Sequence, residues 1–264
     1  KSKYVFEKFA TPQSVLPKMV KNEIDIAFMP LNVAAKAYNL SEKIKCVAIC
    51  GNGNLSLVTK DANIKQFSDI KDKEVYVAGQ GSTPEYMFLY LLNQNGIKAN
   101  LNFSVPTANI PSYLIENQID YAVLPEPFAT IATNKDSNLK KAIDLQEEFK
   151  KFNKEFENYP LTVIVCTKEF AKKNPTLVKD FLDEYKKSLE NTLNHPKIAA
   201  EYTQKHELGL NAQIVEKIIP YSSYVYVPAN QAKEQIYNLL NIFQQIDKKS
   251  IGPKLPDENF FYSE

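Results

Sequence analysis

The sequence has 264 residues, of which 44% are hydrophobic and 24% charged, a composition typical of a globular protein with one large core or two smaller lobes. Its formal net charge of +1 argues against a nucleic-acid or anionic-membrane surface, and no apolar run reaches the roughly 18 residues that a membrane-spanning helix requires. All 32 basic residues are lysines, so a bound carboxylate or phosphate must be held without the two-pronged guanidinium of arginine.

The cysteines and histidines predict neither a disulfide nor a metal site. Cys46 and Cys50 lie in one apolar, strand-like run, where their Cα atoms would be about 13 Å apart, too far for a disulfide. Cys166 lies in a second apolar run, while His195 and His206 lie in Lys/Glu-rich helical sequence without ligand spacing. We therefore expect buried cysteines, no metal and no cofactor.

The chain opens on Lys1-Ser2-Lys3-Tyr4, without an initiator methionine or a signal peptide. We expect that an upstream segment has been removed from it.

The first part of the chain alternates predicted strands and helices. Thr11 and Pro12 fit the N-cap and first position of a helix, and Asn32 fits the cap of another. The predicted elements are a strand at 4–9, a helix at 12–21, a strand at 24–29 and a helix at 33–38.

Residues 60–160 repeat this style. Gly96 ends one predicted helix, and Ser82 and Glu85 before it have the spacing of a capping box. The predicted elements are strands at 74–78, 101–105 and 119–124, and helices at 83–95 and 110–116. Such alternation predicts an α/β fold with mainly parallel sheets flanked by helices.

From residue 168 onward the pattern is mostly helical. Pro196 ends a long amphipathic helix, and a tyrosine-rich apolar segment at 221–228 interrupts the helices. The predicted helices are 175–194, 197–206, 211–219 and 229–246. The Lys/Glu runs at 147–155 and 179–187 are interpreted as solvated helix faces.

An internal repeat is the most informative feature of the sequence. Asn22–Pro30, NEIDIAFMP, recurs as Asn117–Pro125, NQIDYAVLP. Each copy predicts a loop at the carboxyl end of a buried strand, which is where α/β sheets bind ligands. The repeat therefore predicts two equivalent lobes.

A second pair of segments predicts hinge strands between the lobes. Residues 55–60 and 161–168 both begin apolar and end in Thr-Lys, and together they bracket the middle of the chain. We therefore expect a discontinuous first lobe, 1–57 and 166–264, around a continuous second lobe, 58–165.

Several motifs in this order carry a family resemblance. They are Asn22–Pro30 followed by Ala34-Ala35, Asp69–Lys73, Gly79–Pro84, Ala122–Pro127, and Lys168–Phe170 with Asn174-Pro175. The chain resembles substrate-binding proteins of ABC importers, of the nitrate/sulfonate/taurine and thiamine-pyrimidine-precursor type. The resemblance implies a two-lobed clamp of the type II periplasmic-binding kind. Such proteins usually begin with a strand and a ligand-binding loop, and we expect this chain to lack that first unit.

The loop Gly79-Gln80-Gly81-Ser82-Thr83 is the best candidate for ligand binding. Its glycines permit a sharp turn with exposed N–H groups before a helix start, which attracts negative charge. The two hydroxyls would complete a cradle for an anionic or polar group. The loop matches neither a Walker loop nor a full GxGxxG motif, and an ordinary tight turn remains the alternative interpretation.

Other candidates lie at predicted strand ends and hinges. Glu126, between two prolines, would accept a hydrogen bond from a ligand amine or ring N–H; a helix-start charge and an interlobe contact are the alternatives. The remaining ligand candidates are Gly51, Asn52, Gly53 and Asn54 (or simple turn residues), the loop Pro30, Leu31 and Asn32, and the aromatics Phe128, Tyr159 and Tyr224.

These features favour the solute-binding component of an ABC importer over an enzyme. We expect a monomeric periplasmic or lipid-anchored protein that traps a small polar or anionic organic molecule, such as a sulfonate or a heteroaromatic compound, and presents it to a membrane permease. No catalytic residues are predicted. The alternatives are a cytosolic enzyme on the same fold, of the menaquinone futalosine or thiamine-pyrimidine type, and the ligand-sensing domain of a regulator.

Overall fold

The computed structural model describes residues 4–9, 11–207 and 209–263, whose contacts divide into two compact units. The first unit contains the described residues of Lys1–Gly51, Pro160–Glu190 and Val225–Glu264, and the second contains those of Asn52–Tyr159 and Asn191–Tyr224. The sequence-based division assigned all of 166–264 to the first lobe. Residues 191–224 group with the second unit because α10 (Ala212–Ile218) packs against α5 (Phe128–Lys135).

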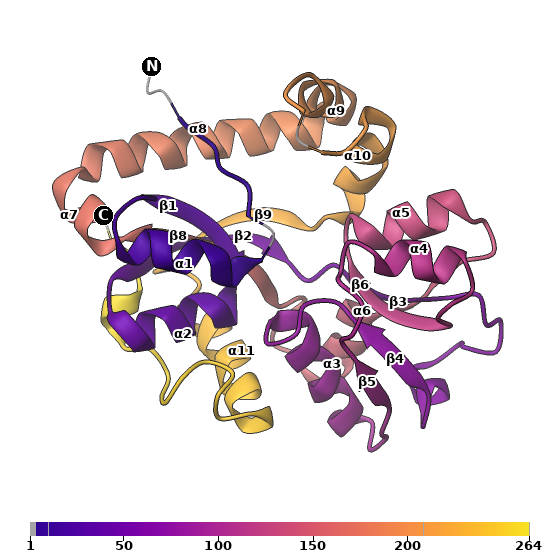
Figure 1. The fold of residues 1–264 in the computed structure, drawn as a ribbon. Coiled ribbons are helices and arrows are strands. Elements are labelled where there is room, and N and C mark those ends of the chain that lie inside the picture. The colour runs from indigo at the N-terminus through magenta and orange to yellow at the C-terminus, as the bar shows by residue number, and fades with distance from the viewer. Residues whose placement is uncertain (1–3, 10, 208, 264) are drawn as a thin grey trace. The chain divides into compact units, whose positions relative to one another are not determined.

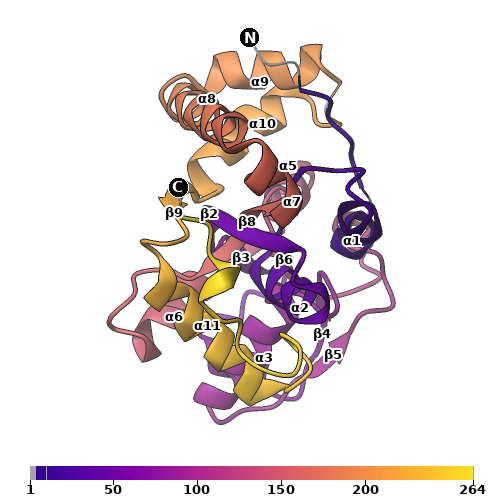
Figure 2. The same ribbon diagram turned by 90° about the vertical axis from the view of Figure 1, so that its left-hand side faces the viewer.

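The first unit is built on a four-stranded sheet. Its strands are β1 (Ile26–Pro30), β8 (Pro160–Thr167), β2 (Ile44–Asn52) and β9 (Tyr224–Pro228), in that order. Helix α8 (Pro175–Asn194) covers one face of this sheet, while α2 (Leu31–Ser41) and α11 (Lys233–Ile246) cover the other (Figures 1 and 2). The first unit therefore has a layered α/β architecture.

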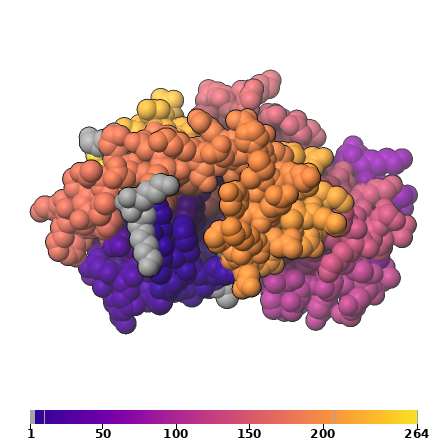
Figure 3. All heavy atoms as spheres, turned by 90° about the horizontal axis from the view of Figure 1, so that it is seen from above, coloured from indigo at the N-terminus to yellow at the C-terminus, as the bar shows by residue number. Residues whose placement is uncertain are grey.

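Helix α8 buries only a narrow stripe against the sheet. Val178 and Leu182 are its buried residues, and they join a core with Ile164 of β8 and Val47 of β2. The opposite side of α8 stands as an exposed surface in Figure 3. This matches its amphipathic sequence, because a surface helix buries one face and solvates the other.

Helix α1 (Pro12–Val20) begins as predicted, with Thr11 at its N-cap and Pro12 at its first position. The strand predicted at 4–9 is wrong. Val5 and Phe6 are 84% and 77% exposed, and no strand of the described chain pairs with this segment. Alternating apolar residues do not make a strand where no neighbour bonds the backbone groups.

Asn32 is not the cap of its helix. Helix α2 begins at Leu31, after Pro30, and makes no side-chain cap bond. Asn32 therefore lies inside the first turn, fully buried, and its Nδ2 donates to the carbonyl of Ser250 at 3.3 Å.

The second unit holds a five-stranded sheet in the order β5-β4-β6-β3-β7. Helices α4 (Ile110–Ile115) and α5 lie on one face and α3 (Thr83–Gln94) and α6 (Leu145–Phe152) on the other (Figure 1). The strands are β3 (Leu55–Thr59), β4 (Glu74–Val77), β5 (Asn100–Asn102), β6 (Tyr121–Pro125) and β7 (Lys140–Asp144).

The α/β class is confirmed, but the sheets are mixed rather than mainly parallel. Strand β4 runs parallel to both β5 and β6. Strand β3 runs antiparallel to β6 and β7, and β1 runs antiparallel to β8 in the first unit. The two segments predicted as hinge strands are β3 and β8. Each of them runs antiparallel to a neighbouring strand of its own sheet.

The remaining elements are mostly helical. Helices α8, α9 and α10 match their predictions closely, whereas α5, α7, β7 and β9 had no counterpart among the predicted elements. The bounds of those not yet given are α7 (Lys168–Lys173), α9 (Pro196–Lys205) and the 3-10 turns η1 (Phe67–Ile70), η2 (Ile219–Tyr221) and η3 (Glu258–Phe260). In the part of the chain that is described, no helix is long and apolar enough to cross a membrane.

The two copies of the repeat share one local geometry. Asn22 and Asn117 both have a left-handed backbone, with φ of 58°. In each copy the residue after the asparagine donates its N–H to a carbonyl five residues earlier, Glu23 to Lys18 and Gln118 to Tyr113. This arrangement ends a helix with a left-handed residue, so each asparagine terminates the helix that precedes its strand.

All three cysteines are free and buried, as predicted. Burial raises the pKa of each thiol, to about 12 for Cys50 and Cys166 and further for Cys46.

Candidate functional site

The ends of four strands meet at one edge of the second unit's sheet. Because β4 and β6 are parallel, the chain leaves both strands at this edge. Leu55 at the start of β3 lies opposite Pro125 at the end of β6. Asp144 at the end of β7 lies opposite Ser56. The structure thereby brings together the Gly79–Thr83 loop, Glu126 and the Asn52–Asn54 turn.

The loop after β4 is closed by its own hydrogen bonds. Gly79 and Gly81 have φ of +76° and +72°, a conformation that glycine adopts without Cβ strain. The Ser82 hydroxyl donates to the Gly79 carbonyl at 2.5 Å, and the Gly81 N–H donates to Glu85 Oε2 at 2.6 Å. The predicted capping box is wrong, because the Glu85 carboxylate takes the amide of Gly81 instead of that of Ser82.

This loop therefore holds a carboxylate, supplied by the chain itself, at the start of α3. Negative charge is favourable there because the N–H groups of a helix start carry a partial positive charge. Thr83 is fully buried at the first position of α3, whereas Gln80 is exposed.

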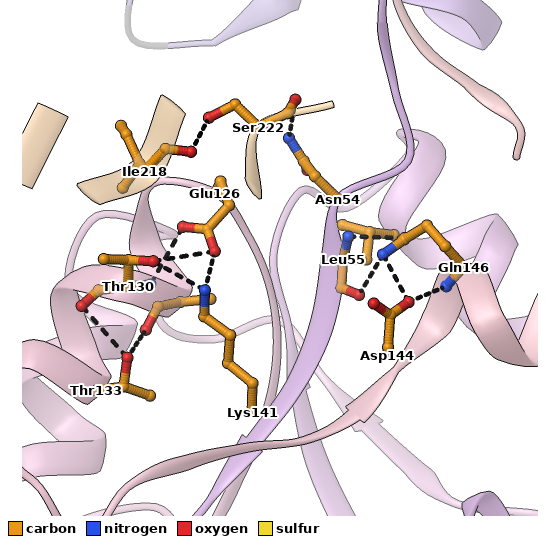
Figure 4. A network of polar contacts seen from close by, with 11 residues as sticks. Asn54, Leu55, Glu126, Thr130, Thr133, Lys141, Asp144, Gln146, Ile218 and Ser222 are labelled. Atoms are coloured by element: carbon orange, nitrogen blue, oxygen red, sulfur yellow. Dashed lines mark hydrogen bonds and ion pairs between the residues drawn. The ribbon is translucent and has the colours of Figure 1, made fainter. Parts of the chain in front are cut away.

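Glu126 is a buried carboxylate that accepts hydrogen bonds from three donors. Its side chain is 3% exposed and accepts from the Thr130 N–H at 3.2 Å and the Thr130 hydroxyl at 3.1 Å. Lys141 donates to the same carboxylate and forms an ion pair with it. These contacts converge in Figure 4. Glu126 thus serves α5 as a helix-start charge, which was the alternative interpretation; contact with a ligand stays a prediction.

Lys141 links this carboxylate to the 3-10 turn η2. Its Nζ also donates to Thr130 Oγ1 at 2.8 Å and lies 4.7 Å from the centroid of the Tyr221 ring. A cation over an aromatic face is attracted by the ring's quadrupole. Lys141 therefore connects β7, α5 and η2 inside the second unit.

The Gln146 side chain forms hydrogen bonds with the backbone of Leu55, the first residue of β3. Its Oε1 accepts from the Leu55 N–H at 2.9 Å and from the Tyr159 hydroxyl at 2.7 Å, and its Nε2 donates to the Leu55 carbonyl at 3.1 Å. Asp144 orients it from the N-cap of α6 by accepting from the Gln146 N–H at 2.8 Å and the Glu147 N–H at 3.0 Å. Figure 4 shows this group beside Asn54.

Gly53 allows the turn before β3 to pack against Tyr159. The Gly53 N–H donates to the Tyr159 carbonyl at 2.8 Å, and a Cβ at Gly53 would lie 2.7 Å from Cε1 of that ring. Tyr159 is only 1% exposed, and this burial raises the pKa of its hydroxyl well above the usual value. Tyr159 thus packs against Gly53 and donates its hydroxyl hydrogen bond to Gln146, and ligand contact stays a prediction.

The flanking asparagines attach this turn to residues 222–223. The Asn52 N–H donates to the Ser223 carbonyl at 2.9 Å, and Asn54 Nδ2 donates to the Ser222 carbonyl at 3.2 Å. Within the described chain, the Oδ1 atoms of both asparagines are buried without a partner. These bonds make the turn a connection between distant parts of the second unit.

The remaining predicted residues are spread over both units. In the first unit, Leu31 and Asn32 are fully buried, Pro30 is half-buried, and Gly51 is buried beside Thr162. In the second unit, Phe128 packs partly buried on the core and Tyr224 is 40% exposed. Contact of these residues with a ligand stays a prediction.

Comparison with known proteins places the chain in a family. A sequence model described as "NMT1/THI5 like" matches residues 7–199, more than half of the chain. The chain belongs to the NMT1/THI5-like family. No curated protein matches this family member in sequence.

Several solved structures of similar fold are described as components of ABC transporters or as binding proteins of such systems. An ABC transporter protein from Parabacteroides distasonis is 27% identical, with a TM-score of 0.81 over 96% of this chain and 86% of that chain. The periplasmic aliphatic sulphonate binding protein SsuA of Escherichia coli is 15% identical, with a TM-score of 0.76 over 96% and 80%. The ligand binding component of an ABC-type import system from Staphylococcus aureus, with zinc bound, is 18% identical, with a TM-score of 0.74 over 97% and 84%. This NMT1/THI5-like chain thus has the two-lobed periplasmic-binding-protein fold.

Two residues that organise the second unit of this NMT1/THI5-like protein, Lys141 and Gln146, were not among the residues predicted from the sequence. Lys141 lies in a Lys-Lys pair that resembles ordinary surface sequence, and nothing nearby points to Glu126. Gln146 lies two residues after Asp144, which is a residue type typical of a helix N-cap, so the start of α6 could have been predicted. Its side-chain bond to β3, 91 residues earlier, has no local signal.

Proposed function

We propose that this protein is the solute-binding component of an ABC importer and carries a small polar or anionic organic molecule to a membrane permease. Several of its structural relatives are described as proteins of this kind, including a sulphonate binder. The ligand class we propose is a sulfonate, or a heteroaromatic compound of the thiamine-pyrimidine type. The protein acts as a monomer outside the cytoplasm, free in the periplasm or lipid-anchored, and binds without catalysing a reaction.

The observation that carries the ligand proposal is the Glu85 carboxylate at the loop after β4. The Gly81 N–H already binds an anionic group there, at the start of a twelve-residue helix where such groups are favoured. Since the chain has no arginine, backbone N–H groups and hydroxyls are the donors best suited to replace a guanidinium. We propose that an anionic group of the ligand takes the place of Glu85 on this loop.

Glu85 then acts as an internal competitor for the ligand. Replacing Glu85 with glutamine keeps the shape of the side chain and removes its charge, so the Gly81 amide loses its charged partner. We expect Glu85→Gln to bind an anionic ligand more tightly than the unmodified protein. Equal or weaker binding by this variant would contradict the competition.

The binding test is a thermal-shift and calorimetric screen of the full chain. The probes are a short alkanesulfonate, an aminopyrimidine and an uncharged alcohol of similar size. We expect a saturable rise in melting temperature with at least one of the first two, because a ligand that binds only the folded state stabilises it. Incubated ligand should be recovered unchanged. A screen without any stabilising solute, or with turnover of one, would refute the proposal.

Two matched glycine variants locate the site. Gly81 and Gly96 both have a left-handed backbone, with φ of +72° and +63°, and at both a Cβ would meet open space. Alanine costs about 1 kcal/mol of stability at each, from the same backbone strain. Only Gly81→Ala, in the proposed loop, should weaken ligand binding, by about tenfold for one disturbed charge-assisted hydrogen bond. Equal affinities in the two variants would place the ligand elsewhere.

Delivery to the permease has its own measurement. We expect the loaded protein, and not the ligand-free protein, to stimulate ATP hydrolysis by its transporter in proteoliposomes.

A further inference from the structure

A separate pocket opens in the second unit. Its volume is about 570 Å³, within the range of small-molecule sites. Helix α5, strand β7, helix α10 and the turn η2 supply its walls. The lining residues are Thr130, Thr133, Asn134, Lys141, Glu216, Lys217, Pro220 and Tyr221. None of the residues predicted for the transported solute lines it.

The charged groups of this pocket are balanced. Lys141 is neutralised by the buried Glu126. Lys217 donates to Asn134 Oδ1, and in the described chain neither Lys217 nor Glu216 forms an ion pair. Successive residues of a helix point about 100° apart and do not face each other. One cation and one anion therefore line the pocket without a charged partner.

The uncharged groups complete a polar and an apolar side. The Thr133 hydroxyl donates to the Ala129 carbonyl at 3.1 Å, which leaves its lone pairs to accept a hydrogen bond. Asn134 lines the pocket and uses its Oδ1 for Lys217, which leaves its amide N–H groups as hydrogen-bond donors. Pro220 and the 63% exposed Tyr221 supply apolar surface.

We propose that this pocket binds a small zwitterion of the amino-acid class. The ligand carboxylate would contact Lys217 Nζ and the Asn134 amide, and its ammonium would contact the Glu216 carboxylate and the Thr133 hydroxyl. The ligand side chain would lie along Pro220 and the Tyr221 ring.

Charge balance distinguishes a zwitterion from simpler ligands. A simple anion would be attracted by Lys217 but repelled by Glu216, and a simple cation would be attracted by Glu216 but repelled by Lys217. A zwitterion pairs both groups without adding net charge to the unit. The pocket shares no lining residue with the proposed transport loop and favours a different ligand class.

The position of the pocket gives the ligand a second effect. Its walls come from α5 and β7 on one side and from α10 and η2 on the other, far apart in the sequence. A ligand that contacts both walls only when they are packed stabilises that packing by RT ln(1 + c/Kd), where c is the ligand concentration, so the effect grows as c rises above Kd. The bound amino acid would therefore reinforce the attachment of residues 212–221 to the rest of the second unit.

The test is a titration of the full chain, followed by amide NMR, with L-leucine as the probe and acetate and methylammonium as half-ligands. We expect saturable shifts at residues 130–134 and 216–221 with L-leucine, and clearly weaker binding of either half-ligand. Acetate binding as tightly as L-leucine would overturn the zwitterion assignment. Shifts confined to residues 79–83 would place the amino acid in the transport site and overturn the separate pocket.

Charge-removing variants complete the test. Lys217→Met and Glu216→Gln should each weaken L-leucine binding by about tenfold, the loss expected for one charged hydrogen bond. Lys205→Met, which removes an exposed lysine from α9, should leave it unchanged. Melting temperatures without ligand check that α10 stays folded. Unchanged L-leucine affinity in folded Lys217→Met would refute the proposal.

Discussion

The ion pair between Glu126 and Lys141 gives the sharpest prediction about stability. Lys141→Met keeps the length of the side chain and its packing against Tyr221, but it removes the positive charge from a carboxylate that is 3% exposed. Breaking a buried pair leaves an uncompensated charge and costs roughly 3–5 kcal/mol. Lys141 itself is 27% exposed and Thr130 keeps both of its bonds to Glu126. We therefore expect a loss of about 2–4 kcal/mol.

A double variant separates the charge effect from lost packing. Glu126→Gln removes the carboxylate charge, so Lys141→Met added to it no longer strands a buried charge. We expect the double variant to recover at least half of the stability that Lys141→Met loses. Urea unfolding followed by far-UV circular dichroism gives the free energies. A loss below about 0.5 kcal/mol in Lys141→Met, the size of an exposed pair, would refute the reasoning, as would additive losses in the double variant.

Three further predictions concern stability, pH and reactivity. Gly53→Ala should lower the free energy of unfolding by about 1–3 kcal/mol, since its Cβ would overlap the Tyr159 ring. In Gly51→Ala the nearest atom to the new Cβ is 3.6 Å away, so this control should lose far less stability in the same thermal melts. The Tyr121 hydroxyl, bonded at 2.6 Å, lowers the pKa of Asp61 from 3.8. This bond stabilises the fold above about pH 4, and its contribution is lost as the pH falls through the lowered pKa. The melting temperatures of Tyr121→Phe and the unmodified protein should therefore differ at pH 6 and converge as the pH falls below that pKa; a constant gap would contradict this. Because burial raises the pKa of all three thiols, iodoacetamide at pH 8 should label them only after unfolding, as mass spectrometry would show.

Local signals in the sequence predicted several helix ends and strands. Pro12 after Thr11 located α1, and Gly96 located the end of α3, because each residue has a restricted or special backbone that punctuates helices. The repeat at Asn22 and Asn117 predicted two strands and, in addition, two helix ends of equal geometry. These features depend on neighbouring residues and can be read without knowing the fold.

Contacts between distant residues could not be predicted in the same way. The strand expected at 4–9 has the right alternation but finds no neighbouring strand in the described chain. Glu85 matches a capping box in spacing, yet its carboxylate reaches Gly81 because the glycine loop folds back over the helix start. The pairing of Lys141 with Glu126 depends on β7 lying beside β3, a tertiary arrangement without a local pattern.

The side chain of Gln146 has a consequence for the motions of the second unit. It bonds both the N–H and the carbonyl of Leu55, so one amide side chain replaces a rung of the sheet where β3 begins. The Leu55 amide hydrogen should therefore exchange with solvent slowly, although it lies at a strand end where exchange is normally fast. The exchange rate of this single amide would therefore measure how often the sheet edge that carries the loop after β4 opens.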